Sequence, residues 1–171
     1  MIHSMVLTTP IGPLSLLALD DTLVASGFTA DPVAQYERLH LSLRKEHDLM
    51  PSADLGDLGK AHQAYFEGDL TALDALPTYH PAPPTRERLW AALRRVPAGE
   101  TVTYGELAAL AGLERGARAA GQACARNMIA PAIPCHRVVA STGSGRRRLN
   151  GYYYGLERKE WLLRHEGALQ I

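Results

Sequence analysis

Hydrophobic residues near the amino terminus gather in three short runs that turn residues separate. The runs are Met5–Thr8, Leu14–Leu19 and Leu23–Phe28, and Val, Leu and Thr are frequent in them. A Thr-Pro-Ile-Gly-Pro segment and the pair Asp20-Asp21 stand between them, and these residue types favour turns. The pattern therefore predicts a small antiparallel sheet in which each of three strands pairs with the next.

Helical periodicity follows this sheet. A stretch that begins at Pro32 carries apolar side chains at spacings of three and four residues, the period of one helix face. Those side chains belong to Val33, Tyr36, Leu39 and Leu43. A second helix is expected over Leu58–Phe66. Strands and helices together predict an α/β unit in the first half of the chain.

A proline-rich segment divides the sequence. Four prolines lie from Pro77 to Pro84, and proline supports neither a helix interior nor a central strand. We therefore expect an α/β N-terminal domain over residues 1–80, a linker over residues 81–84 and a helical domain over residues 85–171. The expected fold class is α+β.

The second half is predicted to be mainly helical. Thr85 is a candidate cap for a helix, and this helix would bury one apolar stripe that consists of Leu89, Trp90, Leu93 and Val96. Thr103 and Glu106 have the spacing of a capping box, so a second helix is expected to run from there to Gly112. A third helix is expected over residues 116–126. The last two helices, joined by a short turn, form a helix-turn-helix.

The second helix of this motif is unusual because it has almost no bulky side chain. Residues 116–126 contain five alanines, with Arg118 near one end and Arg126 at the other. Small side chains let a helix backbone approach another surface closely, and the basic charge fits a nucleic-acid groove. Tight packing of an alanine-rich helix against a neighbouring helix is the alternative, and the sequence leaves both open.

The formal charge is zero, but its distribution is uneven. Residues up to Pro84 carry 4 Lys and Arg against 11 Asp and Glu, whereas the remaining residues carry 14 against 7. Such an asymmetry suggests a polyanionic partner for the second half. Two oppositely charged surfaces that attract each other would explain it equally well.

Neither a metal site nor a cofactor is expected. The chain has two cysteines, Cys124 and Cys135, and they form no Cys-x-x-Cys pair. Five histidines of the first half show no ligand spacing; they are His3, His40, His47, His62 and His80. No apolar run is long enough for a membrane span and the start lacks a secretory pattern, so we expect a cytoplasmic protein with reduced thiols.

One segment carries candidate nucleophilic chemistry. In Pro134-Cys135-His136-Arg137, a histidine and an arginine stand beside a cysteine. A reactive thiolate needs such neighbours, although a buried cysteine is more often an inert small hydrophobe. Adjacent side chains of an extended chain point to opposite faces, so a bend is required to bring His136 to Cys135.

Several motifs in one order resemble the O6-alkylguanine-DNA alkyltransferase family. The resemblance covers residues from about Pro84 to Gly167, and more weakly the Pro10–Leu14 and Tyr65–Gly68 segments. Its pieces are Thr85–Trp90, Gly99–Gly105, Asn127, the Pro-Cys-His-Arg-Val motif around Cys135, and Arg158–Gly167. The resemblance implies a ribonuclease-H-like N-terminal domain and a C-terminal domain with a winged helix-turn-helix.

The same resemblance implies a reaction and its residues. Cys135 would take an alkyl group from O6 of guanine in double-stranded DNA, in a single turnover and without a cofactor. His136 would act as the base, linked through a water to the carboxylate of Glu166, and Asn127 would hold the cysteine segment. It leaves open whether O4-alkylthymine also reacts, and whether the monomer binds DNA cooperatively.

Further residues are implied to contact the substrate. The guanine would be rotated out of the duplex from the minor groove, with Tyr104 against the target nucleotide and Arg118 in the vacated place. Other expected contacts with the base or the DNA are Arg126, Val138, Tyr152, Tyr153 and Tyr154.

Three features depart from the family pattern. A longer loop ends in Arg146, Arg147 and Arg148, which we expect to reach the DNA backbone. Tyr153 and Tyr154 stand where small residues are usual, and Tyr154 is expected to narrow the pocket. Met128 replaces a common proline.

Three other functions are alternatives to alkyl transfer. A non-catalytic lesion sensor of the same fold would carry tryptophan in place of Cys135. A helix-turn-helix regulator would leave Cys135, His136 and Glu166 unexplained. A cysteine hydrolase would need a peptide cleft, which a basic groove-binding helix does not favour.

Overall fold

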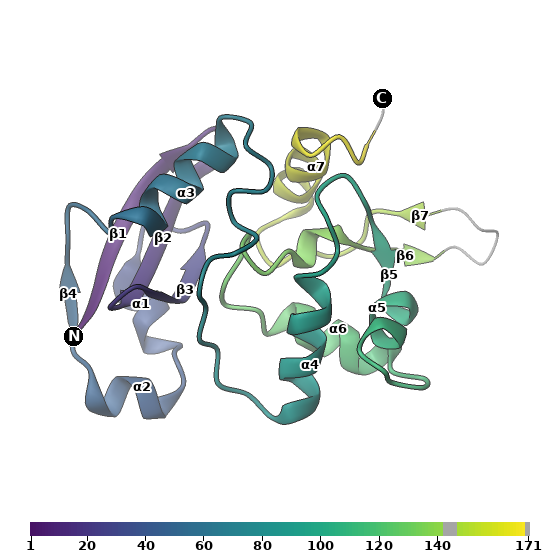
Figure 1. Ribbon diagram of the computed structural model, residues 1–171, viewed down its shortest axis with the longest axis horizontal. Helices are drawn as coiled ribbons and strands as arrows, with labels where there is room; N and C mark the ends of the chain where they lie inside the picture. Colours follow the sequence, from purple (N-terminus) through teal and green to yellow (C-terminus); the bar gives the residue numbers. More distant parts are fainter. Residues whose placement is uncertain (142–146, 170–171) are drawn as a thin grey trace. The chain divides into compact units, whose positions relative to one another are not determined.

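The computed structural model describes residues 1–141 and 147–169, and the chain folds as two compact units (Figure 1). The first unit contains Met1–Pro81 together with Met128–Ala132, and the second contains Ala82–Asn127 and Ile133–Ile171. No sequence pattern indicated that Met128–Ala132 belongs with the first unit. The division into domains 1–80 and 85–171 around a linker stays a prediction.

The first unit is built on a four-stranded sheet in the order β3-β2-β1-β4. Strands β1 (Ile2–Thr9), β2 (Gly12–Leu19) and β3 (Thr22–Gly27) pair antiparallel, which confirms the predicted strand arrangement. β4 (Leu49–Pro51), which was not predicted, pairs parallel to β1 and makes the sheet mixed. Three residues that include a proline give too short a pattern to predict such a strand.

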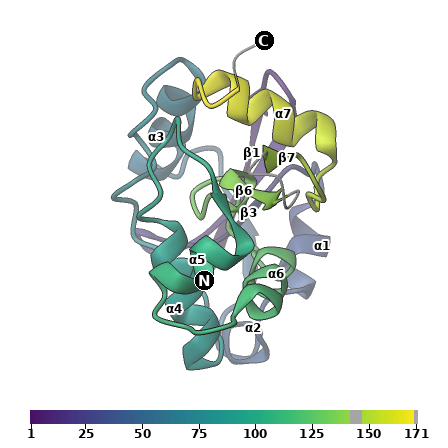
Figure 2. The same cartoon turned by 90° about the vertical axis from the view of Figure 1, so that its right-hand side faces the viewer.

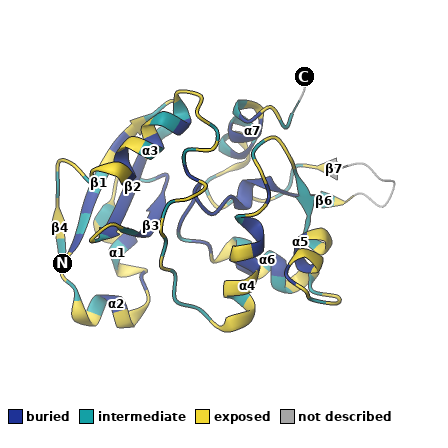
Figure 3. Cartoon of the chain, in the orientation of Figure 1, coloured by how far each residue is buried: buried dark blue, intermediate teal, exposed yellow. Residues whose placement is uncertain are grey.

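Short helices accompany this sheet. α3 (Asp57–Phe66) agrees with the prediction, but the stretch from Pro32 forms two helices, α1 (Pro32–Glu37) and α2 (Leu41–Glu46). The helix is interrupted because His40 has an extended conformation and its ring accepts a hydrogen bond from the Ser42 amide, capping α2. The core of this region consists of Ile2, Leu17, Val24, Ala25, Leu39 and Leu43. Strands β2 and β3 are largely buried (Figure 3).

The segment Met128–Ala132 lies beside β3. The Ser26 amide donates to the Met128 carbonyl at 2.8 Å, and the Ala130 amide donates to the Ser26 carbonyl at 3.2 Å. The Met128 amide donates to Nε2 of His80 at 3.0 Å. These bonds fix the stretch of chain that directly precedes Ile133.

Helices α4 (Pro84–Leu93), α5 (Tyr104–Leu110) and α6 (Ala117–Ala125) pack against one another in the second unit (Figure 2). The predicted apolar stripe of α4 is buried, and Nε1 of Trp90 donates to the Ala123 carbonyl at 2.9 Å. Pro83, not Thr85, caps α4, and two prolines in succession set the backbone there without a side-chain hydrogen bond.

The helix-turn-helix is confirmed in α5 and α6. Thr103 and Glu106 form the predicted capping box. A Cβ atom at Gly116 would lie 2.9 Å from the Cβ atoms of Ala108 and Leu113, so only glycine permits this close turn. In α6, Ala120 and Ala123 are buried whereas Arg118 is exposed. One face of the alanine-rich helix therefore packs tightly, and the other stays open.

A small sheet completes the second unit. β6 (Val138–Ser141) pairs parallel with β5 (Val102–Thr103) and antiparallel with β7 (Arg147–Arg148), which gives the hairpin of a winged helix-turn-helix. Arg146 lies outside the described residues. The last helix is α7 (Leu156–His165). Among the helices described, none is both long and apolar enough to cross a bilayer.

His62 in α3 gives the first unit a pH-dependent stability. Its side chain is fully buried, its Nδ1 bonds to the Leu58 carbonyl at 2.7 Å, and burial lowers its pKa to about 4. An unfolded chain takes up the proton near pH 6.5, whereas the folded chain does so only near pH 4. The stabilisation is therefore complete above pH 6.5 and lost as the pH falls toward 4, by about 3 kcal/mol.

Urea denaturation of His62→Gln at a series of pH values measures this effect. The variant should lose stability at neutral pH and show a flatter dependence of unfolding free energy on pH than the parent. Gln63→Asn, at an exposed position of the same helix, is the matched control and should keep the parent slope. An unchanged slope in His62→Gln would assign the acid sensitivity to other groups.

Candidate active site

Cys135 lies in a single 3-10 turn, η1 (Cys135–Arg137), that links Pro134 to strand β6. All three residues of η1 are buried. The turn supplies the bend in the backbone, so consecutive side chains here do not point to opposite faces as they would in an extended segment.

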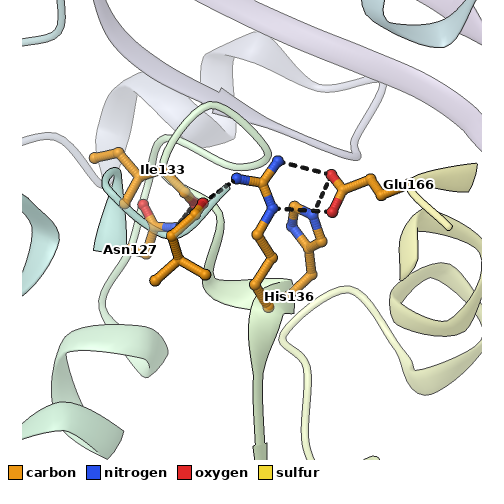
Figure 4. A network of polar contacts seen from close by, with 6 residues as sticks. Asn127, Ile133, His136 and Glu166 are labelled. Atoms are coloured by element: carbon orange, nitrogen blue, oxygen red, sulfur yellow. Dashed lines mark hydrogen bonds and ion pairs between the residues drawn. The ribbon is translucent and has the colours of Figure 1, made fainter. Parts of the chain in front are cut away.

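Asn127 holds the cysteine segment. It follows the end of α6, and its Nδ2 donates to the Ile133 carbonyl at 2.7 Å (Figure 4). The same Nδ2 lies 3.2 Å from Sγ of Cys135, to which it also donates. One buried amide group thus fixes both the backbone before the turn and the thiol. A donor to sulfur stabilises the thiolate over the thiol.

Glu166 receives hydrogen bonds from two residues of η1. Its Oε2 lies 2.8 Å from Nε2 of His136, and the Arg137 guanidinium donates to both carboxylate oxygens at 2.9 Å (Figure 4). Nη1 of Arg137 also donates to the Val96 carbonyl at 2.6 Å. His136 contacts the carboxylate directly, so the expectation of a water between them was wrong, because 2.8 Å leaves no room for one.

The end of α7 sets the position of this carboxylate. Glu166 is the C-cap residue, and Gly167 follows it with φ of +77°, a conformation that glycine adopts readily. A carboxylate is unfavourable beside the negative end of a helix dipole. The contacts with His136 and Arg137 offset that repulsion.

The charges of the three residues follow from burial and contact. Burial opposes ionisation of Glu166, but His136 and Arg137 hold its pKa well below its usual range. Burial lowers the pKa of His136 despite the neighbouring carboxylate, so the imidazole is neutral near pH 7. Its Nδ1 is buried and has no hydrogen-bond partner within the described part of the chain. This nitrogen is therefore available to accept a proton.

The thiol of Cys135 is protonated at rest. Burial raises its pKa, while the Asn127 hydrogen bond and the positive charge of Lys159 act in the opposite direction. Burial also raises the pKa of Cys124. A base is needed to make either sulfur nucleophilic.

A cavity of about 350 Å³ opens at Cys135. Its walls come from the second unit alone: Tyr104, Gly121, Cys124, Ala125, Cys135, Gly151, Tyr152 and Tyr153. The hydroxyl of Tyr104 accepts a hydrogen bond from Nδ2 of Asn150 at 3.0 Å. The cavity offers an aromatic and largely apolar space with a thiol in its wall.

The structure separates the three consecutive tyrosines. Tyr152 and Tyr153 line the cavity, whereas Tyr154 does not, so the expectation that Tyr154 narrows the pocket was wrong. Its ring instead packs edge-on against Tyr152 and Tyr153, with centroid separations of 5.7 and 4.9 Å. Tyr153 lines the cavity although most of its surface is exposed to solvent.

The remaining predicted site residues lie apart from the cavity wall. Arg118 and Arg126 are exposed at the two ends of α6, and Arg148 is exposed in β7. Arg147 belongs to β7. Val138, which was expected at the substrate, is fully buried at the start of β6 and does not line the cavity.

Sequence reasoning missed two buried cations. Arg137 was considered only as a neighbour of the cysteine, and Lys159 was not considered at all. A signal for Lys159 was present, since it shares the helical spacing of Leu162, Leu163 and Glu166. A charged residue on an otherwise buried stripe indicates a specific partner in the interior.

The Glu166 contacts predict a large loss of stability in Glu166→Gln. The substitution removes the carboxylate that pairs with the buried Arg137, and breaking a buried pair in this way costs about 3–5 kcal/mol. Chemical denaturation measures the loss. Glu160→Gln, which breaks an exposed pair with Arg164, is the control and should cost under about 0.5 kcal/mol. Equal small losses would mean that solvent reaches Glu166.

Comparisons with known proteins identify the family. The family described as 6-O-methylguanine DNA methyltransferase, DNA binding domain, matches residues 84–168. The methylated-DNA–protein-cysteine methyltransferase of Shigella flexneri is 36% identical over 167 residues, which cover 96% of this chain and 95% of that protein. The protein of the same name from Mycobacterium tuberculosis is 36% identical over 166 residues, 97% of this chain and 93% of that protein.

A solved structure extends the similarity to the fold. The crystal structure of Mycobacterium tuberculosis OGT in complex with DNA superposes with a TM-score of 0.79 at 32% identity, covering 97% of this chain and 93% of that one. Similarity at this level, over nearly the whole of both chains, establishes common descent. The chain belongs to the 6-O-methylguanine DNA methyltransferase family.

Proposed function

We propose that this protein repairs DNA by transferring the alkyl group of O6-alkylguanine to its own Cys135. The observation that carries the proposal is the thiol in the wall of an aromatic cavity, held by Asn127 and adjacent to a neutral, carboxylate-bound imidazole. Membership of the family supports the same reaction. The substrate class is double-stranded DNA that carries an alkylated guanine.

The reaction needs one proton acceptor and one proton donor. Nδ1 of His136 takes the thiol proton, and Glu166 stabilises the resulting imidazolium. The sulfur then bonds to the alkyl carbon as the carbon–oxygen bond at O6 breaks, and that electron pair goes to the guanine. Burial raises the pKa of Tyr104, which keeps its hydroxyl protonated and able to donate to the base. The guanine takes up one proton in place of the alkyl group, and the imidazolium of His136 releases one. The products are therefore an S-alkyl cysteine and unmodified guanine.

No turnover is expected after this transfer. The product is a thioether, which contains no leaving group that water or His136 can displace. Each molecule therefore accepts one alkyl group, without any cofactor. We propose that the protein acts as a monomer in the cytoplasm and that several monomers can bind one DNA cooperatively.

The geometry of α6 supports access through the minor groove. Most side chains on its open face are small, so the backbone can approach DNA closely, and Gly121 and Ala125 line the cavity. A guanine must leave the base stack before its O6 can meet the thiol. Arg118, exposed at the start of α6, is proposed to occupy the vacated place.

The basic wing is proposed to contact the DNA backbone. Arg148 is exposed in β7, and Arg147 precedes it in the same strand. Arg126 adds a further exposed cation at the end of α6. Phosphate contacts of this kind position a protein on DNA without reading the sequence.

The alternative functions account for fewer of these residues. A lesion sensor that only binds needs no nucleophile, and a transcription regulator needs no buried imidazole beside a carboxylate. A cysteine hydrolase needs an oxyanion hole and a peptide cleft, whereas the cavity is enclosed by three tyrosines and by α6. Alkyl transfer is the reaction that uses the thiol, the base and the cavity together.

Intact-mass measurement tests the transfer. After mixing with duplex DNA that contains O6-methylguanine, the wild type should gain a single methyl group, and peptide mapping should locate it on Cys135. Cys135→Ala should gain none while still binding the duplex, and Cys124→Ala should still gain one. Methyl transfer by Cys135→Ala, or none by the wild type, would refute the proposal.

Arg118→Ala separates extrusion of the base from chemistry. Only a duplex substrate requires the few kcal/mol of extrusion, and each loss of about 1.4 kcal/mol slows the reaction about tenfold. The variant should therefore repair duplex DNA at least about tenfold more slowly, with reaction of the free alkylated base nearly unchanged. Arg164→Ala, at an exposed position of α7, is the control and should repair both substrates at the parent rate. Equal slowing on both substrates would place Arg118 in the chemistry or the folding.

A further inference from the structure

Asn150, which follows strand β7, contacts a cavity residue that lies far from it in the sequence. Its Nδ2 donates to the Tyr104 hydroxyl at 3.0 Å. Tyr104 is the first residue of α5 and lines the cavity that contains the Cys135 thiol. Asn150 itself is not one of the described residues that line this cavity. It therefore influences a bound substrate only through the residues that it contacts.

The backbone is held at both ends of this hydrogen bond. Tyr104 directly follows Thr103, whose capping box with Glu106 starts α5. The backbone carbonyl of Asn150 accepts a hydrogen bond from Nζ of Lys159 at 2.8 Å. Because both backbones are anchored, the bond between the two side chains joins groups whose positions are already set.

The bond decides which way the hydroxyl proton of Tyr104 points. A phenol hydroxyl has one hydrogen to donate and an oxygen that also accepts. Nδ2 of Asn150 carries hydrogens and has no free electron pair, so the Tyr104 oxygen must accept there and its own hydrogen must point elsewhere. Within the described residues that hydrogen has no acceptor, so it is left for a bound substrate.

The same bond makes the hydroxyl a better donor. Burial raises the pKa of Tyr104, whereas the hydrogen bond from Asn150 acts in the opposite direction. The hydroxyl therefore keeps its proton near pH 7. A hydrogen bond received at the oxygen polarises the O–H bond, and consecutive hydrogen bonds of this kind strengthen one another.

The other end of the Asn150 amide gains nothing from its position. Oδ1 is buried and has no hydrogen-bond partner in the described part of the chain. An unpaired buried acceptor destabilises a fold, and an apolar side chain of the same size would avoid that loss. The donor bond to Tyr104 is thus what this side chain contributes among the described residues.

We propose that Asn150 is a positioning residue for alkyl transfer, which occupies the acceptor side of the Tyr104 hydroxyl and directs its proton to the alkylated base. This role rests on the proposed function, since it concerns how the guanine leaves. As the carbon–oxygen bond at O6 breaks, its electron pair goes to the guanine. A donor to the base is therefore bound more strongly in the transition state than before it, so Asn150 acts on the rate of transfer more than on substrate binding.

Single-turnover kinetics with duplex DNA that contains O6-methylguanine test this role. Asn150→Ala and Asn150→Leu leave the Tyr104 hydroxyl free to rotate, and Leu keeps the size of the side chain. Each should lower the maximal rate of methyl transfer about three- to tenfold, the effect of one hydrogen bond, with the half-saturating protein concentration nearly unchanged. Asn150→Asp offers acceptors alone and turns the hydroxyl proton away from the base, so it should be at least as slow.

A double-mutant cycle separates orientation of the hydroxyl from a general packing effect. In a Tyr104→Phe background, Asn150→Ala should cause no further slowing, because no hydroxyl is left to orient. Tyr79→Phe, which removes an exposed hydroxyl of the first unit, is the matched control. It should react at the parent rate, and Asn150→Ala should keep its full effect in that background.

Circular dichroism selects conditions in which every variant is folded. A folded Ala or Leu variant at the parent rate, or slowing that persists undiminished without the Tyr104 hydroxyl, would overturn the role of Asn150 and leave the proposed function intact. Absence of methyl transfer by the wild type would refute the proposed function, and the role of Asn150 with it.

Discussion

The buried carboxylate of Glu166 is the contact on which the rest of the site depends. It joins the end of α7 to the turn η1 through His136 and Arg137, and Arg137 continues to the Val96 carbonyl beyond α4. A buried ion pair is stable only when its remaining hydrogen-bonding groups are also satisfied. Arg137 meets this condition because it donates hydrogen bonds to both carboxylate oxygens and to a backbone carbonyl. These bonds hold η1 in place. Because Cys135 belongs to η1, the same bonds also set the position of its thiol.

Two buried cations, Arg137 and Lys159, form hydrogen bonds at or directly beside the turn η1. Arg137 neutralises Glu166, which leaves the imidazole of His136 neutral and able to accept a proton. Lys159 instead donates to the backbone carbonyls of Val138, Asn150 and Gly151. If Glu166 were paired with His136 alone, its charge would favour a protonated imidazole, which cannot serve as a base. The paired hydrogen bonds from Arg137 to Glu166 thus contribute to reactivity as well as to folding.

Helix α6 meets two opposing demands with the same residue types. Its inner face approaches α4 closely enough for Trp90 to bond to the Ala123 carbonyl. Its outer face leaves the cavity open at Gly121 and Ala125. Larger side chains would strengthen the core on one face but close the cavity on the other. Alanine and glycine satisfy both, which explains why packing and groove binding were equally good interpretations of this sequence.

The sequence by itself determined the local elements and the candidate residues. Strands, the capping box at Thr103, the helix-turn-helix and the Cys135 motif all depend on near neighbours in the chain, whose spacing is visible in one dimension. Only the tertiary structure decided the parallel strand β4, the direct contact of His136 with Glu166, the packing of Tyr154 against its neighbouring tyrosines and the burial of Lys159. These features depend on which distant groups are brought together. A buried polar atom must find its partner wherever the fold places one, and sequence spacing does not encode that partner.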